Sequence, residues 1–197
     1  MDRVRELILE IKEFGENNNV PIMSVDTINK INEIINENDI HSVLEIGTAI
    51  GYSTICFASN ENINRIVSIE RDNERYNIAY NNVKLSNLNN IELIHDDAFN
   101  VSINDKFDLL IIDAAKSQNM KFLDKFKNNL NNNGIIIIDN LNFHGYVGNS
   151  QNIKSRNLRQ MVRKIEKFID YLNNTDEFEV EFIEVGDRLG ICKKKNI

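Results

Sequence analysis

The chain of 197 residues has few of the features that mark several protein classes. Its two cysteines, Cys56 and Cys192, lie far apart in apolar runs with no Cys-x-x-Cys spacing, which excludes a disulfide framework and a cysteine-based zinc site. No apolar run approaches the roughly 18 residues of a membrane-spanning helix, and an amphipathic segment rather than a signal-peptide core follows Met1. We therefore expect a cytoplasmic protein.

The composition otherwise indicates an ordinary soluble domain. Hydrophobic residues make up 42% and charged residues 27%, and the single proline, with no repeat or charge block, gives no sign of a linker. We expect one domain spanning residues 1–197. The net charge of −7 argues against broad non-specific binding to nucleic acid, but it leaves room for a local basic patch.

Short apolar runs alternate with segments of helical length after residue 40. Residues 1–40 carry apolar positions at helical spacing and predict two helices that pack on the domain. Further helices are predicted at 52–59, 73–85, 118–128 and 154–172. Strands are predicted at 42–46, 65–69, 91–94, 107–112, 134–138, 178–184 and 188–193.

This order predicts an α/β fold with a doubly wound, seven-stranded, mostly parallel sheet. Continuous β-branched runs such as 135–138 suit strands that are buried on both faces. The last two predicted strands are joined by a turn at Gly186-Asp187, so they must pair antiparallel.

A glycine turn follows the first predicted strand. Gly47 and Gly51 allow close approach of a ligand to the backbone, and the next helix begins there. Ala49 and Tyr52 replace the later glycines of the dinucleotide fingerprint. With Glu45 just before it, the turn suits a ligand that lacks a pyrophosphate and carries an amino group, such as S-adenosylmethionine. The alternative is a plain tight turn.

Two more strand ends carry acidic residues. Glu70 ends the second strand, about twenty residues past the turn, where a carboxylate can accept hydrogen bonds from both ribose hydroxyls. Asp97 and Ala98 follow the third strand, where an adenine would lie. Together with the turn, these positions predict a nucleoside-cofactor site.

Oxygen-bearing side chains end the fourth and fifth strands. Asp113, Asp139 and Asn140 would reach the same crevice and form a hard-oxygen set suited to Mg²⁺ or Ca²⁺. The alternative for each aspartate is helix N-capping. Lys116, three residues past Asp113, would serve as a general base beside the cation, or would simply be a solvated lysine at a helix start.

Basic residues concentrate in the predicted helix 154–172. The basic positions are Lys154, Arg156, Arg159, Arg163, Lys164 and Lys167. In an acidic protein this cluster predicts phosphate contacts, although a solvated helix face is the alternative.

Four segments together resemble the metal-dependent, catechol-type class I O-methyltransferases over nearly the whole chain. They are EIGTAIGYS at 45–53, IE at 69–70, IDAAK at 112–116 and IDN at 138–140. Within that family the chain looks most like the bacterial tRNA 5-hydroxyuridine methyltransferases. The features that favour this branch are DAAKSQ at 113–118, the run from Asp139-Asn140 to Phe143-His144-Gly145, and the basic helix leading to VGDRLG at 185–190. Arg188 departs from the small or neutral residue common in relatives.

The resemblance implies a homodimer that methylates 5-hydroxyuridine at the tRNA wobble position, with S-adenosylmethionine and Mg²⁺. It implies that Asp113, Asp139 and Asn140 hold the metal and that Asp113 and Lys116 act in catalysis. The cofactor pocket would be lined by Val25, Glu45, Gly47, Ser53, Glu70, Asp97, Ala98 and Asp113. Methylation of a small catechol-like molecule and a non-catalytic binding module remain alternatives.

Overall fold

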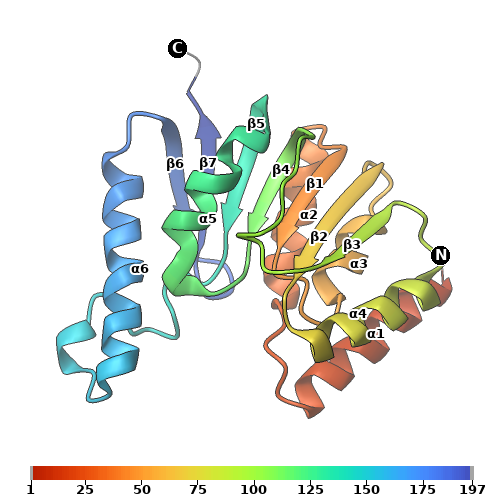
Figure 1. Ribbon diagram of the computed structural model, residues 1–197, viewed down its shortest axis with the longest axis horizontal. Helices are drawn as coiled ribbons and strands as arrows, with labels where there is room; N and C mark the ends of the chain where they lie inside the picture. The colour runs from red at the N-terminus through yellow and green to blue at the C-terminus, as the bar shows by residue number, and fades with distance from the viewer. Residues whose placement is uncertain (1, 196–197) are drawn as a thin grey trace. The chain divides into compact units, whose positions relative to one another are not determined.

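The computed structural model describes residues 2–195, which fall into two compact units that divide between Ile103 and Asn104. Both units are layered α/β structures, with strands covered by helices (Figure 1). We call them the N-terminal and the C-terminal unit.

The N-terminal unit has three parallel strands in the order β3-β2-β1. The first two helices pack against its other helices: α1 lies on α3 and α4, and α2 lies on α3 (Figure 1). Its elements are α1 (Asp2–Asn17), α2 (Val25–Glu37), β1 (Ser42–Ile46), α3 (Tyr52–Ala58), β2 (Arg65–Glu70), α4 (Asn73–Ser86) and β3 (Ile91–His95).

Local sequence explains where α2 begins and which face it buries. The Ser24 side chain caps the helix, because its hydroxyl oxygen accepts a hydrogen bond from the Thr27 N–H at 3.1 Å. Isoleucines at helical spacing then point inward, with Ile31 and Ile35 fully buried. The helical pattern read from residues 28–35 is therefore the core-facing stripe of α2.

The C-terminal unit has four strands in the order β4-β5-β7-β6. β4 and β5 are parallel, whereas β7 pairs antiparallel with both β5 and β6. Its elements are β4 (Phe107–Ile112), η1 (Lys116–Gln118), α5 (Asn119–Phe126), η2 (Lys127–Asn129), β5 (Leu130–Ile138), η3 (Ser150–Asn152), α6 (Arg156–Asn174), β6 (Phe178–Ile183) and β7 (Leu189–Lys194).

Helix α6 is strongly amphipathic. Ser155 caps it, with its side chain accepting from the Leu158 N–H at 3.4 Å. Val162, Ile165 and Phe168 are buried, while the basic residues of the helix stay on its outer side. The helix thus joins the core through one stripe and presents a cationic face.

The predicted fold class is confirmed: all seven strands are present, and the last two form the antiparallel hairpin. The main difference is that β5 begins at Leu130 rather than at residue 134, because residues 131–133 continue the strand despite being exposed asparagines. The helix predicted at 118–128 is divided into η1, α5 and η2. None of the described helices is long and apolar enough to span a membrane.

Candidate active site

The loop between β1 and α3 bends through left-handed backbone conformations. Gly47, Ala49 and Gly51 have φ angles of 108°, 48° and 85°, and a Cβ added at Gly51 would meet Ala79 at 3.4 Å. The Gly47 N–H donates to the Ile69 carbonyl at 3.0 Å, which fixes the turn beside the end of β2. The predicted glycine turn therefore has the shape that a closely approaching ligand needs.

Glu70 connects this turn to the end of β2. Its two carboxylate oxygens accept hydrogen bonds from the backbone N–H groups of Ala49 and Asp72, both at 2.8 Å. The side chain is nearly buried, at 7% exposure. Since each carboxylate oxygen can accept a second hydrogen bond, Glu70 is held in one orientation and still has acceptor capacity for two hydroxyls.

Glu45, which was predicted to line the cofactor pocket, has no surface exposed to a ligand. It is completely buried, and its carboxyl group accepts hydrogen bonds from the hydroxyls of Ser53 (2.6 Å), Thr54 (2.5 Å) and Ser68 (2.6 Å). Ser68 also shares a hydrogen bond with Thr48 at 2.6 Å. This buried network, which sequence patterns did not indicate, ties β1, β2 and α3 together beneath the turn. Ser53 belongs to it.

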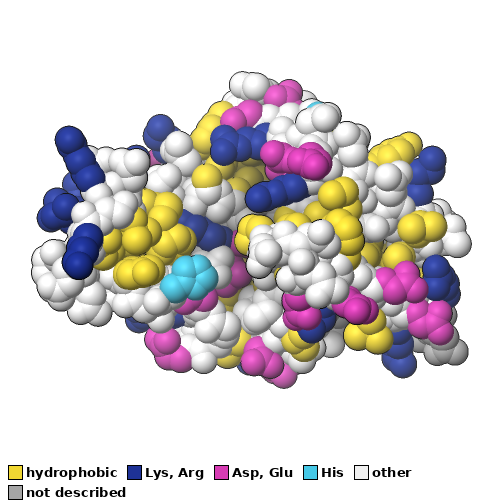
Figure 2. All heavy atoms as spheres, turned by 90° about the horizontal axis from the view of Figure 1, so that it is seen from below, with side chains coloured by type: hydrophobic (Ala, Val, Ile, Leu, Met, Phe, Trp, Pro, Cys, Tyr) yellow, Lys and Arg dark blue, Asp and Glu magenta, His cyan; other side chains and the backbone are white. Residues whose placement is uncertain are grey.

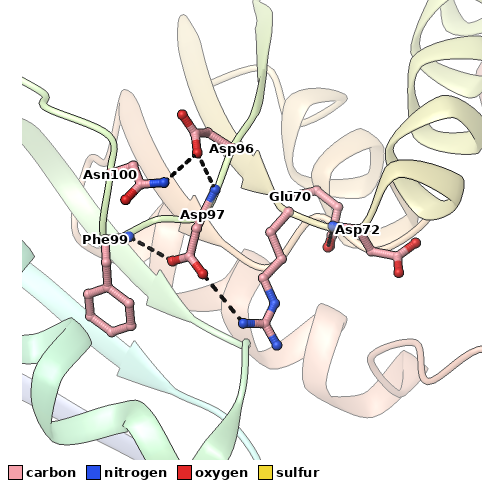
Figure 3. Close-up of polar contacts among 7 residues, drawn as sticks. Glu70, Asp72, Asp96, Asp97, Phe99 and Asn100 are labelled. Atoms are coloured by element: carbon pink, nitrogen blue, oxygen red, sulfur yellow. Dashed lines mark hydrogen bonds and ion pairs between the residues drawn. The ribbon is translucent and has the colours of Figure 1, made fainter.

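Acidic side chains also follow β3, as Figure 3 shows. Asp97 accepts from the Phe99 N–H at 2.9 Å and lies 3.4 Å from the Arg71 guanidinium, while Asp96 accepts from Asn100 at 3.0 Å. Ala98, which directly follows Asp97, is buried. The predicted adenine position is thus an ordered turn. Val25, also predicted to line the pocket, is 42% exposed at the start of α2.

In the C-terminal unit, the ends of β4 and β5 bring two carboxylates together. Ile112 and Ile138 are partners in the parallel pair, so Asp113 and Asp139 follow at matching positions. The Asp139 N–H donates to the Ile112 carbonyl at 3.2 Å, which extends the pairing by one step. The expected convergence of these strand ends is therefore present.

The electrostatics of Asp139 reflect this arrangement. The pKa of its carboxyl is raised to about 6, mainly by burial and also by the nearby Asp113 carboxylate, whereas Lys116 and the Asn140 N–H oppose the shift. Only 2% of Asp139 is exposed. The two carboxylates are therefore close enough to repel one another.

Lys116 partly offsets that repulsion. Its ammonium group contacts the Asp113 carboxylate, and both side chains are largely shielded, at 12% and 19% exposure. Lys116 is therefore not a solvated lysine. The capping alternative for the aspartates is also wrong, because α5 begins at Asn119 without a side-chain cap and α6 is capped by Ser155.

The donor atoms at these strand ends fit a hard divalent cation. Asp139 Oδ1 accepts from the Asn140 N–H at 2.7 Å, whereas its Oδ2 and the Asn140 side-chain oxygen have no hydrogen-bond donor among the described residues. Carboxylate and amide oxygens left free in this way suit Mg²⁺. The part of the chain that the structure describes holds no group of three or more His, Cys, Asp or Glu side chains able to bind a metal. A cation here would thus need Asn140, water or substrate to complete its shell.

The turn between β6 and β7 forms hydrogen bonds with the loop that follows Asp139 and Asn140. The Asp187 carboxylate accepts from the His144 N–H through both oxygens, at 3.0 and 2.9 Å, and its carbonyl accepts from the Asn142 N–H. The Arg188 carbonyl accepts from the Leu141 N–H at 2.9 Å, and the Arg188 side chain stacks on Phe182. Sequence reasoning missed this contact, and left Arg188 without a role, because no local pattern relates residues 141–144 to the turn.

Replacing Asp187 with alanine is expected to loosen residues 142–148 because the His144 N–H loses its charged acceptor. Hydrogen bonds to charged groups contribute about 1.5–3 kcal/mol, so proteolysis within 142–148 should accelerate by roughly tenfold or more. Timed limited proteolysis measures this. Asp187→Asn, which keeps a carbonyl acceptor, is the matched control and should lie closer to the wild type. Equal cleavage rates for the wild type and Asp187→Ala would contradict the assignment.

The predicted phosphate-binding residues lie just before α6 and within its first three turns. Lys154, Arg156 and Arg163 are exposed and Arg159 is half-buried, and none of the four forms an ion pair with a described residue. Arg156 and Arg159 lie in the first turns of the helix, where no acidic residue balances them. Cations at a helix N-terminus are disfavoured by the macrodipole, so stability of the helix does not explain them.

The two cysteines take no part in this chemistry. Both are free and buried, and burial raises the pKa of the Cys56 and Cys192 thiols to about 12. They therefore stay protonated and unreactive at neutral pH.

Comparison with known proteins places the chain in one family. The family described as O-methyltransferase matches residues 2–195. A Staphylococcus aureus structure provisionally named a caffeoyl-CoA O-methyltransferase is 34% identical, with a TM-score of 0.88 over 95% of this chain and 92% of that one. The Bacillus cereus O-methyltransferase in complex with SAH has a TM-score of 0.81 at 21% identity, over 96% and 91% of the two chains. An Arabidopsis thaliana protein, also provisionally named a caffeoyl-CoA O-methyltransferase, is 28% identical over 89% of this chain and 77% of its own length. The chain belongs to the O-methyltransferase family.

Proposed function

We propose that this O-methyltransferase uses S-adenosylmethionine and a divalent cation, Mg²⁺ being the first candidate, to methylate a hydroxyl that has a neighbouring oxygen. The observation that carries the proposal is the pairing of Asp113 with the buried Asp139 at adjacent strand ends, with Lys116 against Asp113. A solvated or purely structural arrangement gives no reason to bury two carboxylates and one amine together.

The N-terminal unit supports the cofactor part of the proposal. Glu70 has acceptor capacity for a ribose diol, and the turn from Gly47 to Gly51 lets a ligand approach the backbone. The family neighbour from Bacillus cereus was crystallised with SAH, the product form of the proposed donor. We assign Glu45 and Ser53 to the support beneath the turn, since their polar atoms bond to each other.

The C-terminal unit supports the acceptor part. When bound, S-adenosylmethionine supplies an electrophilic methyl group and the cation stabilises the deprotonated hydroxyl. Asp113, Asp139 and Asn140 would hold the cation. Lys116 would take up the hydroxyl proton on Nζ in its neutral amine form, after its ammonium group has released a proton to solvent. The contact between Lys116 and Asp113 keeps that amine in place, so the chain contributes mainly by positioning the reacting groups.

For the substrate, we propose 5-hydroxyuridine at the tRNA wobble position. Its hydroxyl and adjacent carbonyl oxygen can chelate one cation. The unpaired basic residues Lys154, Arg156, Arg159 and Arg163 offer contacts to phosphates in a protein whose net charge is otherwise −7.

A small catechol-like substrate is the second candidate. It is favoured by the provisional names of the Staphylococcus aureus and Arabidopsis thaliana relatives, which are caffeoyl-CoA O-methyltransferases. A catechol presents the same two neighbouring oxygens, so the acidic pair alone does not discriminate between these substrates.

The decisive experiment incubates the protein with labelled S-adenosylmethionine, Mg²⁺ and either undermethylated tRNA or a panel of catechols. Nucleoside analysis of the tRNA is expected to reveal 5-methoxyuridine. Label in catechols but not in tRNA would replace the first candidate with the second. No transfer to any acceptor would overturn the proposed activity.

The basic residues provide a separate test. Substituting Arg156 and Arg159 together with glutamine is expected to weaken tRNA binding about tenfold at moderate salt and to leave S-adenosylmethionine affinity unchanged. Each lost phosphate contact should also reduce the salt-dependence slope by about 0.7–0.9. A matched control replaces two other exposed cations, Arg5 and Lys121, with glutamine. If both double variants bind tRNA equally well at every salt concentration, α6 is not the contact.

A further inference from the structure

The loop between β5 and α6 presents a cluster of aromatic rings to solvent. We call residues 142–150 the aromatic loop. The Phe143 ring lies 5.2 Å from the His144 ring and 6.5 Å from the Tyr146 ring, centroid to centroid. Tyr146 is 41% exposed and the His144 side chain is 74% exposed. On the left of Figure 2, where α6 lies in Figure 1, hydrophobic side chains border a histidine and several basic side chains.

The backbone of the aromatic loop is in an unfavourable conformation. Phe143 and His144 have φ angles of 46° and 56°, a region that bulky residues rarely adopt. Such strain persists only where the surroundings enforce it, and it is concentrated at functional sites. Gly145 and Gly148 also have positive φ angles, and a Cβ on either would meet nothing within 4 Å.

Carboxylates from two other elements hold the loop in this shape. Asp187 accepts from the His144 N–H, as described above. Glu166 of α6 accepts from the Gly148 N–H at 2.9 Å and from the Ser150 hydroxyl at 2.8 Å. The loop is therefore held by both carboxylates while the His144 and Tyr146 rings stay exposed and Phe143 is half-buried.

The chain runs from the aromatic loop through η3 directly into the basic start of α6, and the contacts of Glu166 tie the loop to the middle of that helix. Glu166 forms no ion pair with a described cation of the helix, and each of its oxygens accepts a hydrogen bond from the loop. Lys154, Arg156 and Arg159 thus remain unpaired immediately after the aromatic loop. Aromatic faces next to unpaired cations are the combination that binds single-stranded nucleic acid, because bases stack on rings while phosphates meet the charges.

We propose that the aromatic loop is a stacking surface for unpaired bases of RNA, with Tyr146 and Phe143 as the stacking residues and the cations at the start of α6 holding the adjoining phosphates. The inference rests on the proposed tRNA substrate and adds to it the recognition of unpaired bases. The surface would therefore favour an anticodon loop over a duplex, since duplex bases expose no faces to stack upon.

The test measures binding of two RNAs across a salt titration: an anticodon stem-loop and a fully paired duplex of equal length. Tyr146→Ala is expected to weaken binding of the stem-loop roughly tenfold, with an unchanged salt slope and unchanged binding of the duplex. Tyr146→Phe, which keeps the ring, should bind like the wild type. Tyr80→Ala removes another tyrosine of similar exposure, 47%, and serves as the matched control.

The outcomes separate this inference from the proposed function. If the wild type methylates tRNA but Tyr146→Ala and the Phe143→Ala, Tyr146→Ala double variant bind the stem-loop normally, the stacking surface is wrong and the tRNA activity stands. If the variants weaken stem-loop and duplex equally, the loop does not recognise unpaired bases. If the wild type binds neither RNA and methylates only catechols, the stacking surface and the tRNA substrate are both wrong, and the catechol-like substrate replaces them. Thermal melting of each variant verifies that a loss of binding is not a loss of folding.

Discussion

Substituting Asp139 with alanine is expected to reduce methyl transfer by about 10³-fold or more while leaving S-adenosylmethionine affinity nearly unchanged. Charge stabilisation at a metal centre is worth several kcal/mol, and about 1.4 kcal/mol corresponds to a factor of ten in rate. Asp139 is the most deeply buried of the proposed ligands, at 2% exposure. The residues proposed to hold the nucleoside belong to the N-terminal unit and are untouched by the change.

Turnover as a function of Mg²⁺ concentration, together with calorimetric binding of the cofactor, measures both parts of this expectation. Asp176→Ala, which removes an exposed aspartate before β6, is the matched control and should behave like the wild type. Asp139→Asn retains the side-chain shape and one oxygen ligand, so its turnover should lie between that of Asp139→Ala and that of the wild type. Turnover of Asp139→Ala at the wild-type rate without added metal would rule out the role of the acidic pair.

The parts of the site that follow strand ends could be predicted from the sequence because strand order and strand ends are local properties. The apolar runs locate β4 and β5, and a parallel pair must bring the residues after each strand to one edge. Asp113 and Asp139 therefore met as expected. The same logic located Glu70 and the glycine turn, and the contact between the Glu70 carboxylate and the Ala49 N–H bears it out.

The parts that depend on pairing between distant segments could not be predicted. Nothing in the periodicity relates Asp187 to His144, or Glu166 to Gly148, although these contacts shape the aromatic loop. The left-handed conformations of Phe143 and His144 are equally hidden, because such angles are imposed by the surroundings and not by residue type. Spacing of charges did indicate the basic face of α6, since helical spacing is local.

Glu45 illustrates how a correct position can conceal a different role. The acidic residue before a glycine turn suggests a partner for a ligand's amino group, and its place at the end of β1 is as predicted. The Ser68 and Thr54 hydroxyls come from β2 and α3, so their hydrogen bonds to Glu45 depend on tertiary structure and not on local sequence. Such a group can support a ligand site without touching the ligand.

Replacing Glu45 with alanine is therefore expected to lower the free energy of unfolding by about 3 kcal/mol or more, even without cofactor. The change leaves the buried hydroxyls of Ser53, Thr54 and Ser68 without their acceptor, and an unsatisfied buried polar group costs about 1–3 kcal/mol. The Thr48–Ser68 hydrogen bond can relieve only part of this loss. In a domain of this size the melting temperature should fall by about 6–12 °C.

Measuring the melting temperature without cofactor separates the two roles of Glu45, because a bound ligand stabilises only through mass action. Glu61→Ala removes an exposed glutamate and should change the stability by less than about 0.5 kcal/mol. Glu45→Gln keeps one carbonyl acceptor and should recover part of the loss. If Glu45→Ala melts like the wild type without cofactor yet binds S-adenosylmethionine more weakly, the carboxyl group serves the ligand and the network beneath the turn is secondary. A loss of stability without cofactor that Glu45→Gln partly restores would instead establish that the glycine turn rests on a buried polar support.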